Sequence, residues 1–510
     1  MWNLTSILIL VLVFVWSTDA AKYPRGIKKP GRFASNSKST RYGSPDPEVN
    51  RRLAGIARQM LRQYHWGALG VLSDYWETYD YPFVTPKMFA EGNSTYSSGM
   101  PYFFLSPDYY VTQHLEHSHK VSFSVSRMQS GECKEEGIDV QNPRCFFVVF
   151  NGNFTKLERG TPQYEEGYQF LTEKYPRIKT TPNKENYVIG YISLIDVMIV
   201  AGKEELECVP MGAYHNTPPN ENYEEEEFYA TPSKRVKNRK IKKKISRKQN
   251  AHTTSNRVKN GMWNLTLILI LVLVFAWSTD AAKYSRGIKV PGRFASNCKS
   301  TPDPEVNRRL AGIARQMLRQ YHWGALGVLS DYWETYDYPF VTPKMFAEGN
   351  STYSSGMPYF FLSPNYYVTK HLEHSHKVSF SISRVQSSEC NQEGIDVQNP
   401  RCFFVVFNGN FTKLERDTPQ YEEGYQFLSE KYPRIETTTN KENYVIGYIN
   451  LIDVMIFAGK EELECIPMDE YHDTPPNENY EEEEFGSTSS KTFPNTKNNR
   501  KINRKRKARI

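Results

Sequence analysis

The first folded part of the chain begins with a helical pattern of apolar positions. Between Pro47 and Tyr64, apolar side chains recur every three or four residues, and mostly polar side chains fill the positions between them. This spacing predicts one amphipathic helix with a single buried face. Asp46 is suited to cap this helix, and Pro47 suits its first turn, where an N–H group would have no helical partner. The predicted buried face consists of Val49, Leu53, Ile56, Ala57, Met60, Leu61 and Tyr64.

After this helix the pattern changes to short runs rich in valine, phenylalanine and tyrosine. Glycine, proline and asparagine separate the runs, as expected of strands joined by turns. Two further helical segments interrupt them, one near Tyr109 and one near Thr161. We therefore predict an α+β fold, mainly antiparallel β, in which helices lie at the rim of a barrel. The predicted strands span residues 66–73, 82–90, 101–106, 120–128, 144–154 and 187–199.

The whole pattern occurs twice. Every residue of 45–228 has a counterpart 257 positions later, in 302–485, and only 17 of these 184 pairs differ. A repeat of this length is a duplicated domain and not a solenoid unit. The two copies must share one fold, so each motif of copy 1 returns in copy 2.

Each copy opens with a short apolar run that ends in Ser-Thr-Asp-Ala-Ala. Neither run reaches the roughly 18 apolar residues of a membrane span, which excludes a multi-span membrane protein. The first run is typical of a signal peptide, which we assign to residues 1–20. The second, within residues 262–282, lies in mid-chain. Three explanations stay open: two genes joined in one gene model, a polyprotein cut at its basic linker, or a tandem protein anchored by the inner segment.

The formal net charge of +7 comes from two basic segments and not from the folded parts. Residues 234–259 contain 12 lysines or arginines, residues 491–510 contain 9, and neither segment contains an acid. Without these 21 charges the rest of the chain carries −14. The folded copies are therefore not expected to bind nucleic acid. Blocks of this kind are ordinarily solvated tails, with glycosaminoglycan binding or a nuclear signal as the functional alternatives.

The cysteines are spaced as expected of local disulfide bonds. In each copy two cysteines lie twelve residues apart across a turn, and behind a signal peptide such a pair is expected to be oxidised. Closing this loop stabilises the fold by about 3 kcal/mol. For Cys208 and Cys465 two states stay open, a mutual disulfide or two thiols. Cys298 stands where the first copy of the sequence has Ser37. The predicted disulfides are Cys133–Cys145 and Cys390–Cys402.

Glycosylation sequons also occur at matching places in the two copies. Outside the signal segments each copy has two Asn-X-Ser/Thr sequons, and in a secreted chain they are expected to carry N-linked glycans. The predicted glycosylation sites are Asn93, Asn153, Asn350 and Asn410.

Candidate chemistry is sparse. His114, His117 and His119 form an HLEHSH segment, but no cysteine lies near enough to complete a metal site. We expect surface or rim histidines there, and a flexible loop over residues 93–99. No nucleophile elbow, phosphate-binding glycine loop or paired catalytic carboxylate stands out. We therefore assign no catalytic, cofactor-binding or metal-binding residue.

Three segments together resemble the CREG family of secreted glycoproteins. They are Trp66-Gly67-Ala68-Leu69, the run from Gly99 to Pro107, and the stretch between Cys133 and Cys145 with Asn-Pro before the second cysteine. The resemblance covers residues 49–214 and 306–471. It implies a six-stranded split barrel of the flavin-binding superfamily, duplicated in tandem, and a homodimer.

The resemblance also bears on a cofactor. The flavin-using oxidases of this superfamily hold a phosphate with basic residues on the second strand and after the third. Here the second strand offers only Lys87, and the segment from Tyr109 to Thr112 contains no arginine or lysine. CREG-like proteins are understood not to use flavin, so we expect no cofactor, with FMN as the superfamily alternative.

The function implied by the resemblance is binding and not catalysis. CREG-like proteins are secreted or lysosomal glycoproteins that act in growth or differentiation control, and their glycans can engage a mannose-phosphate receptor. A flavin-dependent oxidoreductase is the alternative. Two copies on one chain are expected to pair with each other, because the linker keeps them at high effective concentration. The predicted segments are a signal peptide (1–20), copy 1 (45–215), a linker (216–261), an inner apolar segment (262–282), copy 2 (302–472) and a tail (473–510).

Overall fold

The computed structural model describes most of both copies. The described residues are 44, 46–107, 109–131, 133, 145–200, 206–221, 302–364, 366–387, 390, 402–438, 440–457 and 463–478. The predicted signal peptide, the inner apolar segment, Cys298, both basic segments and most of the linker and tail lie outside them. In the described part of the chain, no helix is long and apolar enough to cross a membrane.

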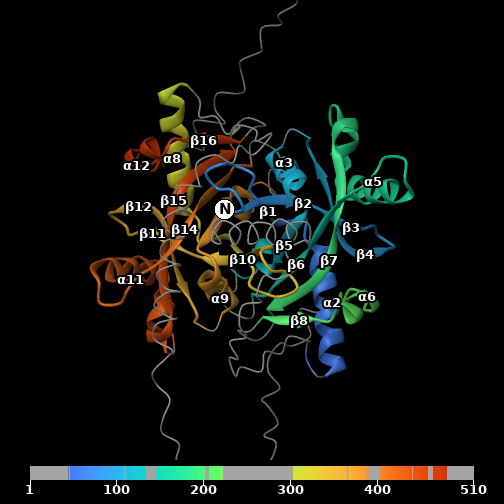
Figure 1. The fold of residues 1–510 in the computed structure, drawn as a ribbon, viewed down its shortest axis with the longest axis horizontal. Coiled ribbons are helices and arrows are strands. Elements are labelled where there is room, and N and C mark those ends of the chain that lie inside the picture. The colour runs from blue at the N-terminus through green and yellow to red at the C-terminus, as the bar shows by residue number, and fades with distance from the viewer. Residues whose placement is uncertain are drawn as a thin grey trace, which may run out of the picture. The chain divides into compact units, whose positions relative to one another are not determined.

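Copy 1 consists of one sheet with helices beside it, and the helices lie between strands in the order of the chain (Figure 1). Its elements are α2 (Pro47–Gln63), β1 (Trp66–Leu72), β2 (Pro82–Met88), β3 (Ala90–Gly92), β4 (Ser97–Leu105), α3 (Tyr110–His117), β5 (Lys120–Ser126), η1 (Arg127–Ser130), β6 (Phe147–Lys156), α5 (Pro162–Lys174), η2 (Pro176–Thr180), η3 (Lys184–Asn186), β7 (Val188–Val200), β8 (Glu207–Val209) and α6 (Met211–Asn216).

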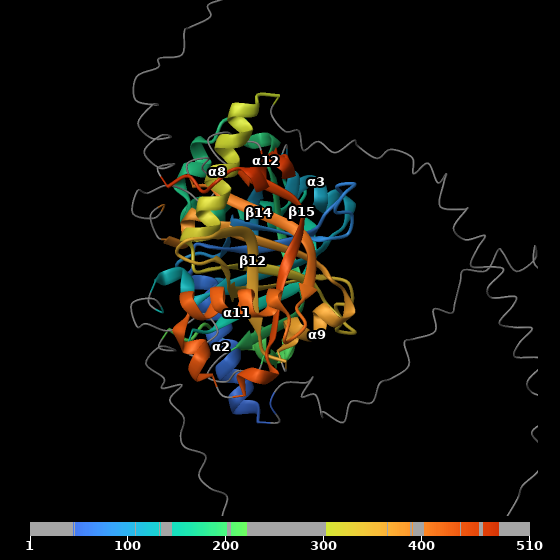
Figure 2. The same cartoon turned by 90° about the vertical axis from the view of Figure 1, so that its left-hand side faces the viewer.

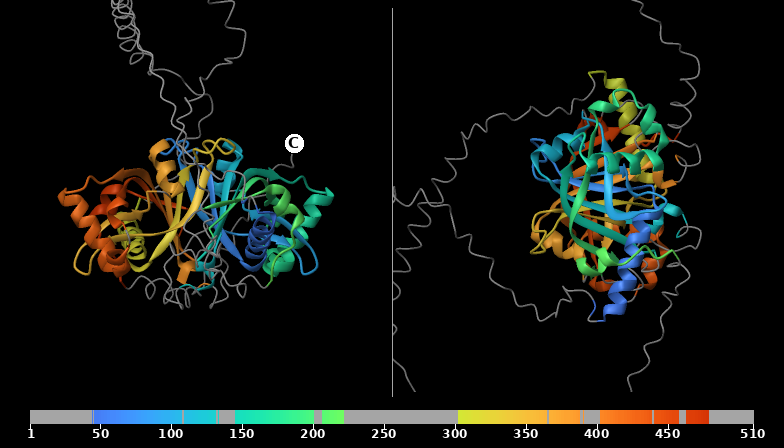
Figure 3. Two further views of the ribbon diagram at one scale, coloured as in Figure 1. Left: turned by 90° about the horizontal axis from the view of Figure 1, so that it is seen from below. Right: turned by 90° about the vertical axis from the view of Figure 1, so that its right-hand side faces the viewer.

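Copy 2 repeats this order element by element, as the blue-to-green and yellow-to-red halves of Figure 3 show. Its elements are α8 (Pro304–Gln320), β9 (Trp323–Leu329), β10 (Pro339–Met345), β11 (Ala347–Gly349), β12 (Ser354–Leu362), α9 (Tyr367–His374), β13 (Lys377–Ser383), η4 (Arg384–Ser387), β14 (Phe404–Lys413), α11 (Pro419–Lys431), η5 (Pro433–Thr437), η6 (Lys441–Asn443), β15 (Val445–Phe457), β16 (Glu464–Ile466) and α12 (Met468–Asp473).

Each copy is built on one antiparallel sheet. The strand order is β2-β1-β5-β6-β7-β4-β3, with β8 added on β7, and copy 2 has the same order. Figure 2 shows helices α8 and α11 beside strands β12 and β15 of copy 2. The predicted α+β class, the antiparallel split-barrel architecture and the tandem duplication are confirmed. The six predicted strands are all present, and the short strands β3 and β8 are additional.

The first helix forms as its apolar spacing predicts. Leu53, Ile56 and Met60 of α2 are buried in the core of copy 1. The Asp46 side chain accepts a hydrogen bond from the backbone N–H of Glu48 at 2.9 Å and so caps the helix. One face of α2 therefore packs on the sheet, while Arg51 on the opposite face is exposed to solvent.

The loop predicted over residues 93–99 is shorter than expected, because residues 97–99 belong to β4. This segment is a tight hairpin between β3 and β4, in which Asn93 N–H donates to Tyr96 O at 2.9 Å. Gly99 adopts φ = 74°, which favours glycine, and a Cβ atom there would lie 2.9 Å from the guanidinium group of Arg58 in helix α2. Polar composition here reflects a hairpin at the sheet edge.

The two copies contact each other directly along a surface that we call the seam. In it, β1, β2 and β5 of copy 1 pack against β9, β10 and β13 of copy 2. The backbone N–H of Val84 donates to Ser379 Oγ at 3.2 Å, and Val341 N–H donates to Ser122 Oγ at 3.1 Å. Val84 and Val341 form a small apolar cluster with Ala68 and Ala325.

Glycine sets the distance between the copies. A Cβ atom on Gly70 would lie 2.4 Å from Val341 Cγ2, and one on Gly327 would lie 2.4 Å from Val84 Cγ2. Atoms do not approach so closely without displacement, so any side chain at these positions would push the seam apart.

We expect Gly70→Ala to lower the free energy of unfolding of the full chain by about 1–3 kcal/mol, the usual cost of overpacking. Urea unfolding measures the effect. Gly212→Ala is the matched control, because a Cβ atom there meets nothing within 4 Å and copy 2 already has Asp469 at this place. Equal unfolding midpoints for the two variants would contradict the close packing of the seam.

Candidate functional site

A small hollow lies at the centre of the seam. Trp66 and Trp323 stack across it with ring centroids 6.4 Å apart and planes 17° from parallel. The free space inside the hollow is about 20 Å³, and serine and glutamine side chains from both copies complete its wall. An aromatic ring inserted between the two indoles would need about 7 Å between them. The hollow therefore suits water or a small group and not a stacked flavin.

The residues expected near a flavin phosphate are engaged within the protein. The Lys87 side chain is buried, and its Nζ lies 3.6 Å from the centroid of the Tyr109 ring. Lys344 and Tyr366 of copy 2 repeat this cation–π contact at 3.5 Å. Among the residues that the structure describes, these lysines are thus covered by tyrosine rings and are not open to a phosphate. This arrangement does not fit a phosphate group.

A histidine and an aspartate hold the 73–81 loop against helix α3. His114 Nδ1 lies 2.5 Å from Asp74 Oδ1, and the His114 side chain is fully buried. Burial lowers the pKa of His114, and this effect outweighs the opposing hydrogen bond that the imidazole donates to the Asp74 carboxylate. Partial burial acts to raise the pKa of Asp74, but the hydrogen bond with His114 brings it below its ordinary value. We therefore assign a neutral imidazole beside a carboxylate.

This pair is not arranged for catalysis. The rings of Tyr75 and Phe83 pack on His114 at centroid distances of 4.8 and 4.7 Å. His114 Nε2 is buried and has no hydrogen-bond partner within the described residues. A general base needs an accessible lone pair, and aromatic rings enclose this one. His117 Nε2 lies 3.1 Å from Oδ1 of Asp80, which belongs to the same 73–81 loop as Asp74.

The expectation of surface or rim histidines is wrong for His114. The histidines at positions 114 and 117 do share one helix face, and that face meets the 73–81 loop, where His114 is fully buried whereas His117 is exposed. In the part of the chain that the structure describes, no cluster of three or more histidine, cysteine or acidic side chains is arranged to hold a metal ion.

Each copy also places a carboxyl group next to the seam. Asp196 of β7 accepts a hydrogen bond from Asn151 Nδ2 at 2.7 Å. Burial raises the pKa of Asp196 to about 7; the Asn151 hydrogen bond opposes this rise and the charge of Glu334 in copy 2 adds to it. Asp453 has the same environment, built from Asn408 and from Glu77 of copy 1, and its pKa is also about 7.

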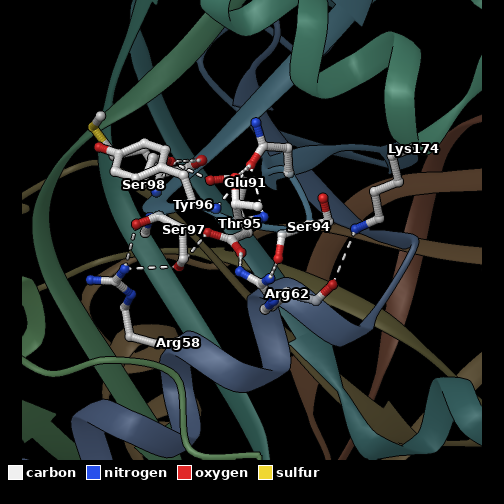
Figure 4. A network of polar contacts seen from close by, with 12 residues as sticks. Arg58, Arg62, Glu91, Ser94, Thr95, Tyr96, Ser97, Ser98 and Lys174 are labelled. Carbon is white, nitrogen blue, oxygen red and sulfur yellow. Dashed lines mark hydrogen bonds and ion pairs between the residues drawn. The ribbon is translucent and has the colours of Figure 1, made fainter.

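A buried polar network fixes the hairpin that carries the first sequon (Figure 4). Glu91 of β3 is buried and accepts hydrogen bonds from Ser97 Oγ at 2.8 Å and from Gly99 N–H at 3.2 Å. Arg58 of α2 donates to the backbone oxygen and the hydroxyl of Ser97, both at 2.8 Å. Arg62 donates to Ser94 O at 3.0 Å. Helix α2 and the β3–β4 hairpin are therefore held as one rigid piece.

Lys174 completes this network from helix α5. Its Nζ donates to Tyr64 O at 2.6 Å, where helix α2 ends, and lies 4.6 Å from the centroid of the Phe89 ring. Burial lowers the pKa of Lys174 to about 7, against the attraction of Glu91. A cation at the end of a helix favours its unpaired carbonyl groups, so Lys174 joins α5 to α2.

The predicted local disulfides are present. Cys133 and Cys145 are bonded, and so are Cys390 and Cys402, with Cα–Cα distances of 5.8 Å in both pairs. The suggested bond between Cys208 and Cys465 does not form, because Cys465 is in a disulfide whereas Cys208 is not.

The sequon asparagines occupy two kinds of place. Asn93 and Asn350 lie in the β3–β4 and β11–β12 hairpins, and Asn153 and Asn410 lie on the long strands β6 and β14. Glycosylation at these four positions stays a prediction.

Comparison with known proteins identifies the family. The family model described as the CREG β-barrel matches residues 48–216 and 305–473, which is more than half of the chain. The chain belongs to the CREG family. Its fold agrees with this assignment, since both matched ranges are antiparallel sheets with flanking helices.

Relatives with the CREG name are distant in sequence. Human protein CREG1 is 25% identical over 147 residues, which cover 29% of this chain and 66% of the human protein. Chicken protein CREG1 is 27% identical over 177 residues, covering 34% of this chain and 90% of the chicken protein. The match to the human protein thus spans slightly less than two thirds of its length.

Solved structures show a weaker likeness. A heme binding protein from Mycobacterium smegmatis is 13% identical, with a TM-score of 0.27, over 34% of this chain and 62% of that protein. The heme storage protein HutZ from Vibrio cholerae is 13% identical, with a TM-score of 0.23, over 31% of this chain and 93% of that protein. At these values neither likeness says anything about a ligand of this CREG chain.

The carboxyls beside the seam predict a pH-dependent stability. The ordinary pKa of an aspartate is 3.8, and the folded values are about 7, so the folded state keeps two protons that the unfolded state releases. Their stabilising effect is complete below about pH 4 and is lost as pH rises through 7. The free energy of unfolding should fall by on the order of 2 kcal/mol per carboxyl over this window.

The double variant Asp196→Asn, Asp453→Asn should flatten this part of the profile, because asparagine keeps the shape and does not titrate. Chemical unfolding of the full chain between pH 4 and pH 8 measures it. The double variant Glu158→Gln, Glu415→Gln removes two exposed carboxyls and serves as the control. The assignment fails if both double variants keep the slope of the parent chain.

Proposed function

We propose that this chain is a secreted or endolysosomal CREG glycoprotein. Its two barrels, paired along the seam, act as a non-catalytic scaffold that binds a receptor or protein partner in growth or differentiation control. Membership of the CREG family supports this proposal. The disulfides support the compartment, because such bonds persist in oxidising surroundings.

The covered lysines carry the non-catalytic part of the proposal. In both copies the cation on the second strand is buried against a tyrosine ring, at 3.6 and 3.5 Å. The buried Asp74–His114 pair has its free ring nitrogen enclosed by aromatic rings. Neither arrangement offers reacting groups to a substrate, whereas a rigid paired scaffold suits recognition of another protein.

The partners follow from the surface and from the family. We propose a mannose-phosphate-type receptor that binds the glycans, and glycosaminoglycans that bind the basic segments outside the described residues. The acidic folded copies disfavour nucleic acid. Direct contacts across the seam support pairing of the two copies within one chain.

We expect the secreted full-length chain to be colourless and to lose added flavin mononucleotide on desalting, because its second-strand lysines are covered. A visible absorption spectrum before and after desalting measures this. The double variant Tyr109→Ala, Tyr366→Ala uncovers both lysines and tests whether the rings exclude the phosphate. A flavin band that persists in the parent chain would favour a flavin-dependent oxidoreductase and overturn the proposal.

Uptake of the purified chain by cultured cells should decrease when free mannose 6-phosphate is added, because the sugar competes with the glycans for a receptor. Fluorescently labelled chain and flow cytometry measure the uptake. Mannose 1-phosphate at the same concentration controls for charge. Equal uptake under both conditions would remove the mannose-phosphate receptor from the list of partners.

A further inference from the structure

Two of the four sequon asparagines are contacted by the opposite copy. Asn153 Oδ1 accepts a hydrogen bond from the Tyr338 hydroxyl of copy 2 at 3.0 Å. Reciprocally, Asn410 Oδ1 accepts one from the Tyr81 hydroxyl of copy 1, also at 3.0 Å. Both tyrosines end the loop before the second strand of their copy. The two sequons are therefore part of the contact between the copies.

This contact leaves the modification chemistry possible. The tyrosine binds the oxygen of the amide, whereas an N-linked sugar is attached to its nitrogen. Asn153 is exposed, so its amide nitrogen has access to solvent. In the transfer, Nδ2 loses one proton and bonds to C1 of an N-acetylglucosamine, while C1 leaves the diphosphate of a lipid-linked oligosaccharide. The lipid diphosphate departs, and no oxidant is needed.

Aromatic and cationic groups of both copies surround this position. Lys120 is the register partner of Asn153 on the neighbouring strand β5. Its Nζ lies 5.1 Å from the centroid of the Tyr338 ring and donates to Tyr336 O at 3.4 Å. Tyr336 presents an exposed ring on the same loop. In the reciprocal site, Lys377 contacts Tyr81 and donates to the backbone oxygen of Tyr79.

An exposed tyrosine beside a sequon is suited to a sugar. The C–H groups on the face of a pyranose ring are apolar and pack on aromatic rings, while its hydroxyls bind water and lysine. The first sugar on Asn153 would lie on the protein surface beside the Tyr338 hydroxyl and next to the Tyr336 ring. One glycan would then touch both copies.

We propose that Asn153 and Asn410 carry N-linked glycans whose first sugars pack on the 73–81 and 331–338 loops of the opposite copies and so brace the seam. This inference rests on the proposed function as a secreted glycoprotein. It assigns these two glycans a structural role at the seam, separate from any role in receptor binding.

The other two sequons provide an internal comparison. Asn93 Oδ1 accepts hydrogen bonds from Thr95 N–H, Thr95 Oγ1 and Tyr96 N–H at 2.8–3.0 Å, all within its own hairpin. Asn350 does the same in copy 2. Within the described residues, the hydrogen bonds of these two asparagines stay in their own copy. Their glycans should therefore be open to enzymes.

Site-resolved deglycosylation of the folded, secreted full chain tests the proposal. A peptide N-glycanase in ¹⁸O-labelled water converts each released site to labelled aspartate, which peptide mass spectrometry counts over time. The same digestion of denatured chain gives the intrinsic rate at each site. After this correction, Asn153 and Asn410 should lose their glycans at least about tenfold more slowly than Asn93 and Asn350, because release requires local opening of the seam.

The double variant Tyr79→Ser, Tyr336→Ser removes the proposed sugar platforms and keeps the backbone carbonyls that bind the lysines. It should raise release at Asn153 and Asn410 and leave the hairpin sites unchanged. A general loss of folding would accelerate all four sites and is thereby distinguished. Equal corrected rates in the parent chain overturn the bracing role, and so do unmodified Asn153 and Asn410 beside glycosylated hairpins. A secreted chain with no glycan at any site overturns the proposed glycoprotein itself.

Discussion

The close approach of two β-sheets at Gly70 and Gly327 determines which groups of the two copies come into contact across the seam. Each glycine faces a valine of the other copy, so the backbones come near enough for serine hydroxyls to bind backbone N–H groups across the seam. This approach brings the charges of Glu334 and Glu77 near Asp196 and Asp453 and lets the tyrosines at the ends of the 73–81 and 331–338 loops reach the sequons. A rigid core in each copy is needed to hold such a contact.

Local patterns were sufficient to predict most of the fold. Helix α2 follows from apolar spacing and its Asp46 cap, and the long strands follow from runs of β-branched and aromatic residues bounded by turn formers. The start of β4 at Ser97 was missed because the order of its hairpin depends on a buried glutamate and on arginines of a distant helix. Arg58 and Ser97, which it binds, are separated by 39 positions, and spacing alone contains no sign of their contact.

The site was less predictable because most of it is made between the copies. The lone aspartate in the apolar run around position 196 is a visible signal, since a charge in a buried strand demands a partner. Its hydrogen-bond partner is Asn151 of the same copy, whereas Glu334, whose like charge adds to the rise of its pKa, belongs to the other copy and cannot be identified from one repeat. His114 shows the same difficulty within one copy, because Asp74, which orients the imidazole, lies 40 residues earlier.

The two halves of the seam are not identical. Val200 of copy 1 corresponds to Phe457 of copy 2, which stacks on Phe404 with ring centroids 5.0 Å apart and also meets Tyr109 of copy 1 at 6.1 Å. In a dimer of separate identical chains, such a replacement would occur on both sides at once. When both halves belong to one chain, each can mutate independently, so duplication permits an asymmetric pair whose two outer surfaces diverge towards different tasks.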